Sequence, residues 1–340
     1  MRLVIRFLIV DLLLLAAFLA ASFYATHVPR GEQTKTIVIE PKTSTQNIMA
    51  QLHAEGLVPS LPFMAPSLIM GKLRGAPSLK AGEYEFAPNL NAAEIIDMIR
   101  RGAVVVHKIS IPEGWNSFQV REALMKEPLL TGDVPKIPEG SVFPDTMHFA
   151  RGEPRAAVLA RMQRAGETIL AELWKNRDEN LPIQTPEEAL ILASIVEKET
   201  GVDGERGKVA GVFTNRLRIG MKLQTDPTVV YGIELAQGGK PLGRALTTND
   251  LQRDTPHNTY TREGLPPTPI CNPGRAALLA TLHPEATDAL YFVATGTGGH
   301  HFSVTLKEHE QHVAAYRALM RATSAPEPVL DKDMRNNIKQ

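Results

Sequence analysis

The chain has 340 residues, of which 43% are hydrophobic and 22% are charged, so it is long enough for two or three domains with apolar cores. Lysine and arginine together number 37, as do aspartate and glutamate, and this balance leaves no basic footprint for a nucleic acid. The single cysteine, Cys271, excludes an intramolecular disulfide and a cysteine-rich metal site.

The strongest compositional feature is the N-terminus, where an apolar run extends from Phe7 to Ala25 with two polar interruptions. As a helix this run would measure roughly 28 Å, close to the hydrocarbon thickness of a bilayer. Arg2 and Arg6 precede it, and positive charge on that side predicts a cytoplasmic N-terminus with the body of the protein in the periplasm or exterior. We predict a cytoplasmic tip and a single transmembrane anchor over residues 1–30. A cleaved signal peptide is the alternative.

Residues 31–104 are predicted to form a small α+β module. The pattern indicates a strand over 37–40 with a helix after it, a strand around Tyr84, and a helix over 91–101 that ends at Gly102. The β-α-α-β order resembles a LysM-like sugar-binding domain, and a spacer without a ligand is the alternative.

The strand and helix pattern that starts at Ile37 recurs from Ile109 at a constant offset of 72 residues. Two copies are too few for a solenoid, so a shared strand-turn-helix unit is predicted. We expect residues 105–150 to form a subdomain that joins the module to the core of a catalytic domain spanning 105–325. A polar tail, 326–340, follows.

A helix over 186–200 is predicted by "TPEEALILASIVEKETG". Thr185 is the expected N-cap, Pro186 the first helical residue and Glu188 the partner of a capping box, while Gly201 is the expected stop.

The two glutamates near the end of this helix fall on different faces. At about 100° per residue, Glu199 lies with Leu192, Ile195 and Val196 on an apolar stripe, and Glu197 points about 160° away. Glu197 is expected to be solvated or paired. Burial and the C-terminal helix dipole both raise the pKa of a carboxyl at position 199, as a proton donor near neutral pH requires. A glutamate at the edge of an ordinary core is the alternative.

The following hundred or so residues contain polar loops where a core would be aliphatic. An amphipathic helix with Val209, Val212, Phe213 and Leu217 inward is expected to end at Gly220. The polar triplet Gln224, Thr225 and Asp226 precedes Pro227, which suits a binding loop. The residues 258–274 are predicted to be irregular. Candidate sugar-binding side chains are Tyr231, Asn258, Tyr260 and Asn272, although turn-building is the likelier role for each taken singly.

Several long motifs occur in order: "ASIVEKET", "NRLRIGMKLQTDPTVVYG", "NTYTREGLPPTPICNPG" and "LYFVATGTGGHHFSVTLKEH". Together they resemble the endolytic murein transglycosylases of the MltG (YceG-like) family over roughly residues 35–320. The resemblance implies an inner-membrane protein that cleaves nascent peptidoglycan strands internally, with penicillin-binding-protein synthases as candidate partners. It implies that the second glutamate of E-K-E, Glu199, is catalytic, and that His300 joins Gln224, Thr225, Asp226, Asn258, Tyr260 and Asn272 among the cleft residues.

The predicted fold is therefore α+β, with an N-terminal transmembrane helix, a LysM-like module and a larger mixed catalytic domain. The predicted activity is a lytic transglycosylase that needs no cofactor and leaves 1,6-anhydro-MurNAc ends, thereby limiting strand length. A hydrolase would need a second carboxylate, for which Asp226 is the candidate. A non-catalytic anchor for wall synthases is the alternative from another class of protein.

The histidines at 300, 301, 309 and 312 lack a metal-binding spacing, and no serine-nucleophile motif occurs.

Overall fold

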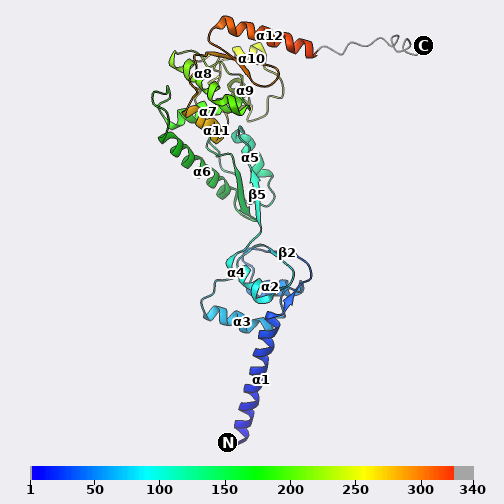
Figure 1. The fold of residues 1–340 in the computed structure, drawn as a ribbon. Helices are drawn as coiled ribbons and strands as arrows, with labels where there is room; N and C mark the ends of the chain where they lie inside the picture. The colour runs from blue at the N-terminus through cyan, green and yellow to red at the C-terminus, as the bar shows by residue number, and fades with distance from the viewer. Residues whose placement is uncertain (1, 325–340) are drawn as a thin grey trace, which may run out of the picture. The chain divides into compact units, whose positions relative to one another are not determined.

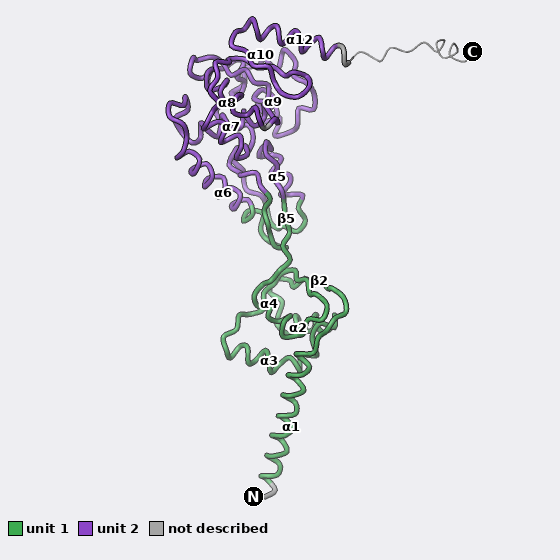
Figure 2. Tube along the Cα trace, viewed as in Figure 1, with its two compact units in different colours: residues 1–109, 127–133, 146–158 green, residues 110–126, 134–145, 159–340 purple. Residues whose placement is uncertain are grey.

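The computed structural model describes residues 2–324 (Figure 1). They divide into two compact units, coloured separately in Figure 2. The first unit holds the chain up to residue 109 with 127–133 and 146–158, and the second holds 110–126, 134–145 and the chain from 159. The predicted tail, 326–340, lies outside the described residues.

Helix α1 (Arg2–His27) contains the predicted membrane span. Its segment Val4–His27 has 24 residues and is long and apolar enough to cross a membrane. Large apolar side chains such as Leu12 and Leu14 are more than 60% exposed along it. An apolar surface of this kind is suited to lipid.

The first unit is built on the antiparallel pair β2 (Lys35–Ile39) and β3 (Gly82–Phe86), in which Ile37 faces Tyr84. A second short pair joins β1 (Pro29–Arg30) to β4 (Leu90–Asn91). The helices α2 (Thr45–Ala54), α3 (Leu61–Leu73) and α4 (Ala92–Arg101) complete this part of the unit. Its core contains Ile37, Ile39, Met49, Leu52, Tyr84, Phe86, Ile95 and Ile99.

The ends of α4 match the sequence prediction. Asn91 and Glu94 form a reciprocal capping box, and Gly102 closes the helix in the left-handed conformation at φ 74°. The predicted β-α-α-β order is present as β2-α2-α3-β3, although no residue range is predicted for the second helix, α3. Sugar binding by this module stays a prediction.

The repeated strand-turn-helix unit is also present. The strand β5 (Val106–Ser110) precedes α5 (Ser117–Lys126), as β2 precedes α2. Val120 and Leu124 are fully buried, as are their counterparts Ile48 and Leu52. The strand β5 pairs with β6 (Thr146–Ala150).

The second unit is largely helical around α7 (Pro186–Glu199), which packs against α8 (Arg206–Arg218), α9 (Asp226–Ala236) and α11 (Arg275–Leu282). The helix α6 (Arg155–Lys175) precedes α7, and α10 (Thr248–Gln252) follows α9. The hairpin β7 (Tyr291–Ala294) and β8 (His300–Ser303) packs on α12 (Leu306–Ser324). The core contains Leu192, Ile195, Val196, Val209, Phe213 and Leu278.

The predicted start of α7 is confirmed, and the predicted stop is wrong. The Thr185 hydroxyl accepts a hydrogen bond from the Glu188 backbone N–H at 3.1 Å. The helix ends at Glu199, because Thr200 takes an extended conformation at φ −140° and no glycine in the left-handed region is needed. Glu199 is therefore the last helical residue, directly before the chain turns away.

Candidate active site

Glu199 projects from the C-terminal end of α7, where the helix dipole places negative potential. Ile195 and Val196, one turn earlier, are fully buried, while Glu199 itself is only partly accessible. The helix thus delivers a carboxyl group from the core to the edge of the unit. That position combines burial with access from solvent.

The polar triplet 224–226 lies beside the segment 258–260. The N–H of Gln224 donates to the Thr259 carbonyl at 3.2 Å, and the N–H of Thr225 donates to the Thr259 hydroxyl at 3.0 Å. The Tyr260 hydroxyl donates to Asp226 Oδ1 at 2.6 Å. Gln224 is exposed at φ 50°, a left-handed conformation that a non-glycine residue adopts rarely. The predicted loop is present, except that Asp226 already belongs to α9.

Burial raises the pKa of Glu199. The Thr225 hydroxyl opposes this shift, although its geometry falls short of a regular hydrogen bond. The negative charge of Asp226 raises the pKa further, while the charges of His300 and Arg216 lower it. The net direction is upward, which keeps a proton on Glu199 at higher pH than on an exposed glutamate.

His300 is held by Glu205, which belongs to the short 3-10 helix η1 (Asp203–Glu205) directly after α7. Glu205 accepts from the His300 backbone N–H at 2.8 Å and from Nδ1 at 2.7 Å. Since a carboxylate is the acceptor, Nδ1 carries the proton of this hydrogen bond. Partial burial raises the pKa of Glu205, but the hydrogen bonds from His300 outweigh it and the net pKa is lowered.

Gly299 leaves room for the contact between Glu205 and His300. Its φ is 89°, and a Cβ atom there would lie 2.7 Å from Glu205 Oε1. A larger residue would therefore strain the backbone and push the carboxylate away from His300.

Arg216 supplies buried positive charge near Glu199. Its Nε donates to the Leu290 carbonyl at 2.6 Å, and its Nη1 donates to the Leu223 carbonyl at 2.7 Å. These bonds fix the chain that leads into the polar triplet. Neither Arg216 nor Glu205 is predicted as a site residue from the sequence, and the signal for Arg216 is its place inside the N-R-L-R motif.

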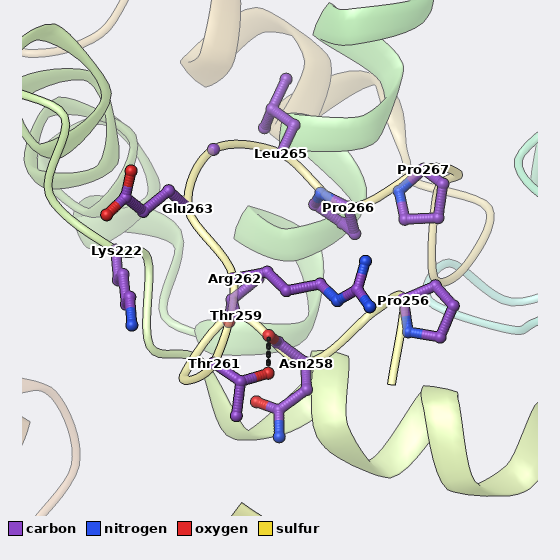
Figure 3. Close-up of a pocket in the computed structure, with 11 residues that line it drawn as sticks. Lys222, Pro256, Asn258, Thr259, Thr261, Arg262, Glu263, Leu265, Pro266 and Pro267 are labelled. Atoms are coloured by element: carbon purple, nitrogen blue, oxygen red, sulfur yellow. Dashed lines mark hydrogen bonds between the residues drawn. The ribbon is translucent and has the colours of Figure 1, made fainter. Parts of the chain in front are cut away.

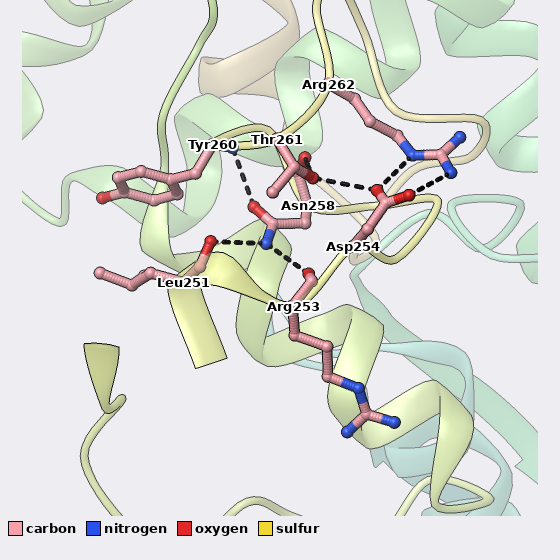
Figure 4. Close-up of polar contacts among 7 residues, drawn as sticks. All are labelled: Leu251, Arg253, Asp254, Asn258, Tyr260, Thr261 and Arg262. Carbon is pink, nitrogen blue, oxygen red and sulfur yellow. Dashed lines mark hydrogen bonds and ion pairs between the residues drawn. The ribbon is translucent and has the colours of Figure 1, made fainter. Parts of the chain in front are cut away.

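Asn258 holds the loop that carries Tyr260 (Figure 4). Its amide nitrogen donates to the carbonyls of Leu251 and Arg253, and its amide oxygen accepts from the Tyr260 N–H. The side chain is fully buried, so these contacts use the whole amide group. This arrangement favours a loop-building role, and a sugar contact stays a prediction.

The same loop borders a pocket of about 530 Å³ (Figure 3). Lys222, Thr261, Arg262 and Glu263 supply its polar lining, and Pro266 and Pro267 supply apolar lining. Arg262 is paired with Asp254 at 2.9 Å. Neither Glu199 nor Asp226 lines this pocket, so it is a neighbour of the carboxyl group and does not enclose it.

Asn272 is placed elsewhere. It is fully buried, its amide oxygen accepts from the Val142 N–H, and its amide nitrogen donates to the Trp115 carbonyl. It therefore ties the loop after α9 and α10 to the segment around α5. Direct contact with a sugar stays a prediction.

Tyr231 is also placed away from Glu199. It lines a cavity of about 910 Å³ together with Glu139, Leu190 and Ile191, and Glu199 does not contribute to that lining. Its hydroxyl donates to Glu139 at 3.1 Å, and its ring is 5% exposed. Burial raises the pKa of Glu139, but Ser117 and Tyr231 already engage its carboxylate.

Glu197 is paired and buried, so the solvated alternative is wrong. Its Oε2 accepts from the Gly274 N–H at 2.9 Å, at the N-cap of α11, and its Oε1 lies 4.0 Å from Arg206. The helical wheel implied an outer face for this residue. The neighbouring helix α11 covers that face.

Among the described residues, no group of three or more His, Cys, Asp or Glu could hold a metal ion. Cys271 is fully buried and donates to the Ser194 carbonyl, and burial raises the pKa of its thiol well above the usual range. A thiol in that setting is a poor nucleophile.

The fold and the site define an α+β protein whose central helix ends in a protonatable glutamate beside a polar loop. The chain belongs to the YceG-like family, whose family model matches residues 37–315. A crystal structure of a YceG-like protein from Listeria monocytogenes aligns with a TM-score of 0.50 and 28% identity, over 83% of this chain and 99% of that one.

Two curated relatives carry the name endolytic murein transglycosylase. The one from Bacillus subtilis (strain 168) is 38% identical over 183 residues, which are 52% of this chain and 48% of the relative. The one from Streptococcus pneumoniae serotype 2 (strain D39 / NCTC 7466) is 31% identical over 183 residues, 52% of this chain and 32% of the relative. The chain thus spans about half the length of the first relative and about a third of the second.

Proposed function

We propose that this protein is a membrane-anchored lytic transglycosylase that cleaves MurNAc-GlcNAc bonds inside peptidoglycan strands. The observation that carries the proposal is Glu199, a carboxyl group of raised pKa at the accessible end of a buried helix. The names of the curated relatives support the substrate class.

In the proposed reaction, Glu199 gives its proton to the oxygen that bridges the two sugars, and the bond from that oxygen to MurNAc C1 breaks. The carboxylate then takes the proton of the MurNAc 6-hydroxyl while that oxygen bonds to C1. The glutamate ends protonated, no water is consumed, and the new end is a 1,6-anhydro sugar. The 6-hydroxyl is part of the same sugar, so its effective concentration favours it over water.

Neighbouring charges support the use of Glu199 as an acid. Burial and Asp226 favour the protonated form that the first step needs. His300 and Arg216 stabilise the carboxylate that remains after the proton leaves, which limits the cost of that proton transfer.

A hydrolase is the second candidate, because Asp226 is close enough to Glu199 to raise its pKa. Such an enzyme would use Asp226 to activate water or to attack the sugar. Against this role, the Asp226 carboxylate already accepts a hydrogen bond from Tyr260.

Product analysis in heavy-oxygen water separates the two. Purified glycan strands are cut by the full-length protein, and the new ends are examined by mass spectrometry. Unlabelled anhydro ends are expected from the lyase, each one water lighter than a reducing end. Labelled reducing ends at every cut would reject the lyase and make Asp226 the next residue to change.

We also propose that α1 anchors the protein in the bacterial inner membrane, with Arg2 and Arg6 on the cytoplasmic side and the rest in the periplasm. A chain that begins at Val28 keeps strand β1 and its pairing with β4. Without α1 this shorter chain should be released from membranes by alkaline carbonate, unlike the full-length protein, and should still cut isolated strands. Full-length protein in the soluble fraction would contradict the anchor.

A further inference from the structure

Helix α3 has an apolar surface that the first unit leaves uncovered. Its sequence, LPFMAPSLIMGKL, contains one charged residue, Lys72. Leu61 is 37% exposed, Ile69 60%, Met70 48% and Leu73 76%, whereas Met64 is buried. We call these four exposed residues the α3 apolar face. A short helix that is apolar on both its inner and its outer sides is normally covered by protein or by lipid.

The helix α3 lies beside the C-terminal part of α1, and both belong to the first unit (Figure 1). The Ser22 hydroxyl donates to the Phe63 carbonyl at 2.5 Å. The rings of Phe18 and Phe63 stack with their centroids 5.9 Å apart. These contacts fix where the first turn of α3 meets the helix that crosses the membrane.

That meeting point sets the depth of α3. The apolar run from Phe7 to Ala25 has its middle at Ala16, so Ser22 lies about 9 Å beyond the middle at the rise of an α-helix. The hydrocarbon region extends about 15 Å to either side of its centre. With α1 across the bilayer, Phe63 is therefore level with the outer part of one leaflet, and α3 starts within the membrane boundary.

Positive charge lies at the opposite end of α3. Lys72 and Arg74 are exposed there, and the Arg100 guanidinium packs against Gly71, where an added Cβ atom would lie 2.4 Å from Nη2. Long basic side chains at the end of an apolar helix can extend to lipid phosphates while their stems stay on apolar surface. No aspartate or glutamate occurs between Leu61 and Leu73.

We propose that α3 is a second membrane contact, a helix that lies in the leaflet at the C-terminal end of α1 with the α3 apolar face toward lipid. The first unit is then seated on the bilayer surface by two helices. This inference rests on the proposed anchor, because the depth of α3 is set by α1. The inference concerns α3 and not α1, and it goes beyond the proposed enzymatic activity.

The test uses full-length protein in vesicles of phosphatidylcholine and phosphatidylglycerol. A Cys271→Ala background receives one cysteine at a time, at Ile69 or Leu73 on the α3 apolar face. Ser67, which is exposed and lies about 160° around the same helix from Ile69, is the matched control, and Leu13 in α1 reports the anchor. Each cysteine carries a fluorescent label, and quenching by lipids with spin labels on their acyl chains is measured. Circular dichroism checks that each variant is folded.

We expect the labels at 69 and 73 to be quenched about twofold more strongly than the label at 67, and the label at 13 to be quenched strongly. Quenching at 13 with none at 69 and 73 would overturn the inference and leave the anchor standing. Absence of quenching at 13 would reject the anchor, and the inference with it. Disulfide formation between copies of unlabelled Leu73→Cys protein, with no lipid quenching of the labelled protein, would assign the face to a second copy and overturn the membrane contact.

Discussion

Two glutamates separated by a single residue have contrasting surroundings at the end of α7. Glu197 is held by the N–H of Gly274 and lies near Arg206, so the protein itself uses its carboxylate. Glu199 faces the Thr225 hydroxyl, Asp226 and His300, and its raised pKa keeps a proton available. Burial raises the pKa of both groups, so burial alone does not identify the acid. The difference lies in whether protein donors already satisfy the carboxylate.

The largest expected effect in this comparison comes from Glu199→Gln. The amide cannot transfer a proton, so strand cleavage should fall by about 10²- to 10⁴-fold, the usual contribution of a general acid-base. The cleavage rate on purified strands measures the effect, and an unchanged thermal unfolding midpoint shows that the fold is intact. Cleavage at a rate comparable with the unaltered protein would remove Glu199 from the mechanism.

Asp226→Asn tests the effect of the negative charge of Asp226 on Glu199. Asp226 raises the pKa of Glu199, so its neutralisation should lower that pKa. Activity requires protonated Glu199 and declines as the pH rises through its pKa, so the alkaline limb of the profile should move to lower pH. The measurement is the cleavage rate against pH, with Tyr260→Phe as a control that keeps the charge. A loss as complete as that of Glu199→Gln would instead favour the hydrolase.

Glu205→Gln tests the support of His300. The amide keeps the volume but holds the imidazole less firmly, so kcat should fall about tenfold with little change in KM. The double variant with His300→Gln should be no worse than His300→Gln alone, because Glu205 acts through the histidine. Additive losses in the double variant would show that Glu205 has a separate role.

The smallest effect on cleavage is expected from Glu197→Gln, which should keep most of the activity. Its amide oxygen can still accept the Gly274 N–H, so the start of α11 is retained. Glu197→Ala leaves that N–H without its partner and should cost about 1–3 kcal/mol of unfolding free energy, measured by denaturant titration. Loss of cleavage in a stable Glu197→Gln protein would contradict the assignment of a structural role to Glu197 and a catalytic role to Glu199.

Local patterns in the sequence predict much of the secondary structure. Thr185 and Glu188 mark the start of α7, and Asn91, Glu94 and Gly102 mark both ends of α4, since capping depends on residues a few positions apart. The stop of α7 is missed, because Thr200 turns the chain without a glycine. The residues of helix α3 are not predicted either, since an apolar run without alternation gives no periodic signal.

The candidate site likewise has features that the sequence predicts and contacts that appear only in the folded chain. Periodicity places Glu199 on an apolar stripe, and sequence motifs place Asp226 and Tyr260 in polar loops. Only the folded chain joins Asp226 to Tyr260, 34 residues later, and Glu205 to His300, 95 residues later. Asn258 and Asn272 carry the residue types of a sugar site, but both amide groups are fully buried and bound to backbone. The partners of Asn258 lie in its own loop, whereas Asn272 bonds to Trp115 and Val142, more than a hundred residues earlier.

Composition and short spacings in the sequence already indicate the apolar length of α1, the starts of the main helices and the apolar stripe that carries Glu199. These features depend on composition and on spacings of a few residues, which a chain fixes before it folds. Only the tertiary structure decided that α11 covers Glu197, that Glu205 orients His300 and that α3 meets α1 at Phe18 and Ser22. Such contacts join segments far apart in the chain, and their positions follow from the packing of the core.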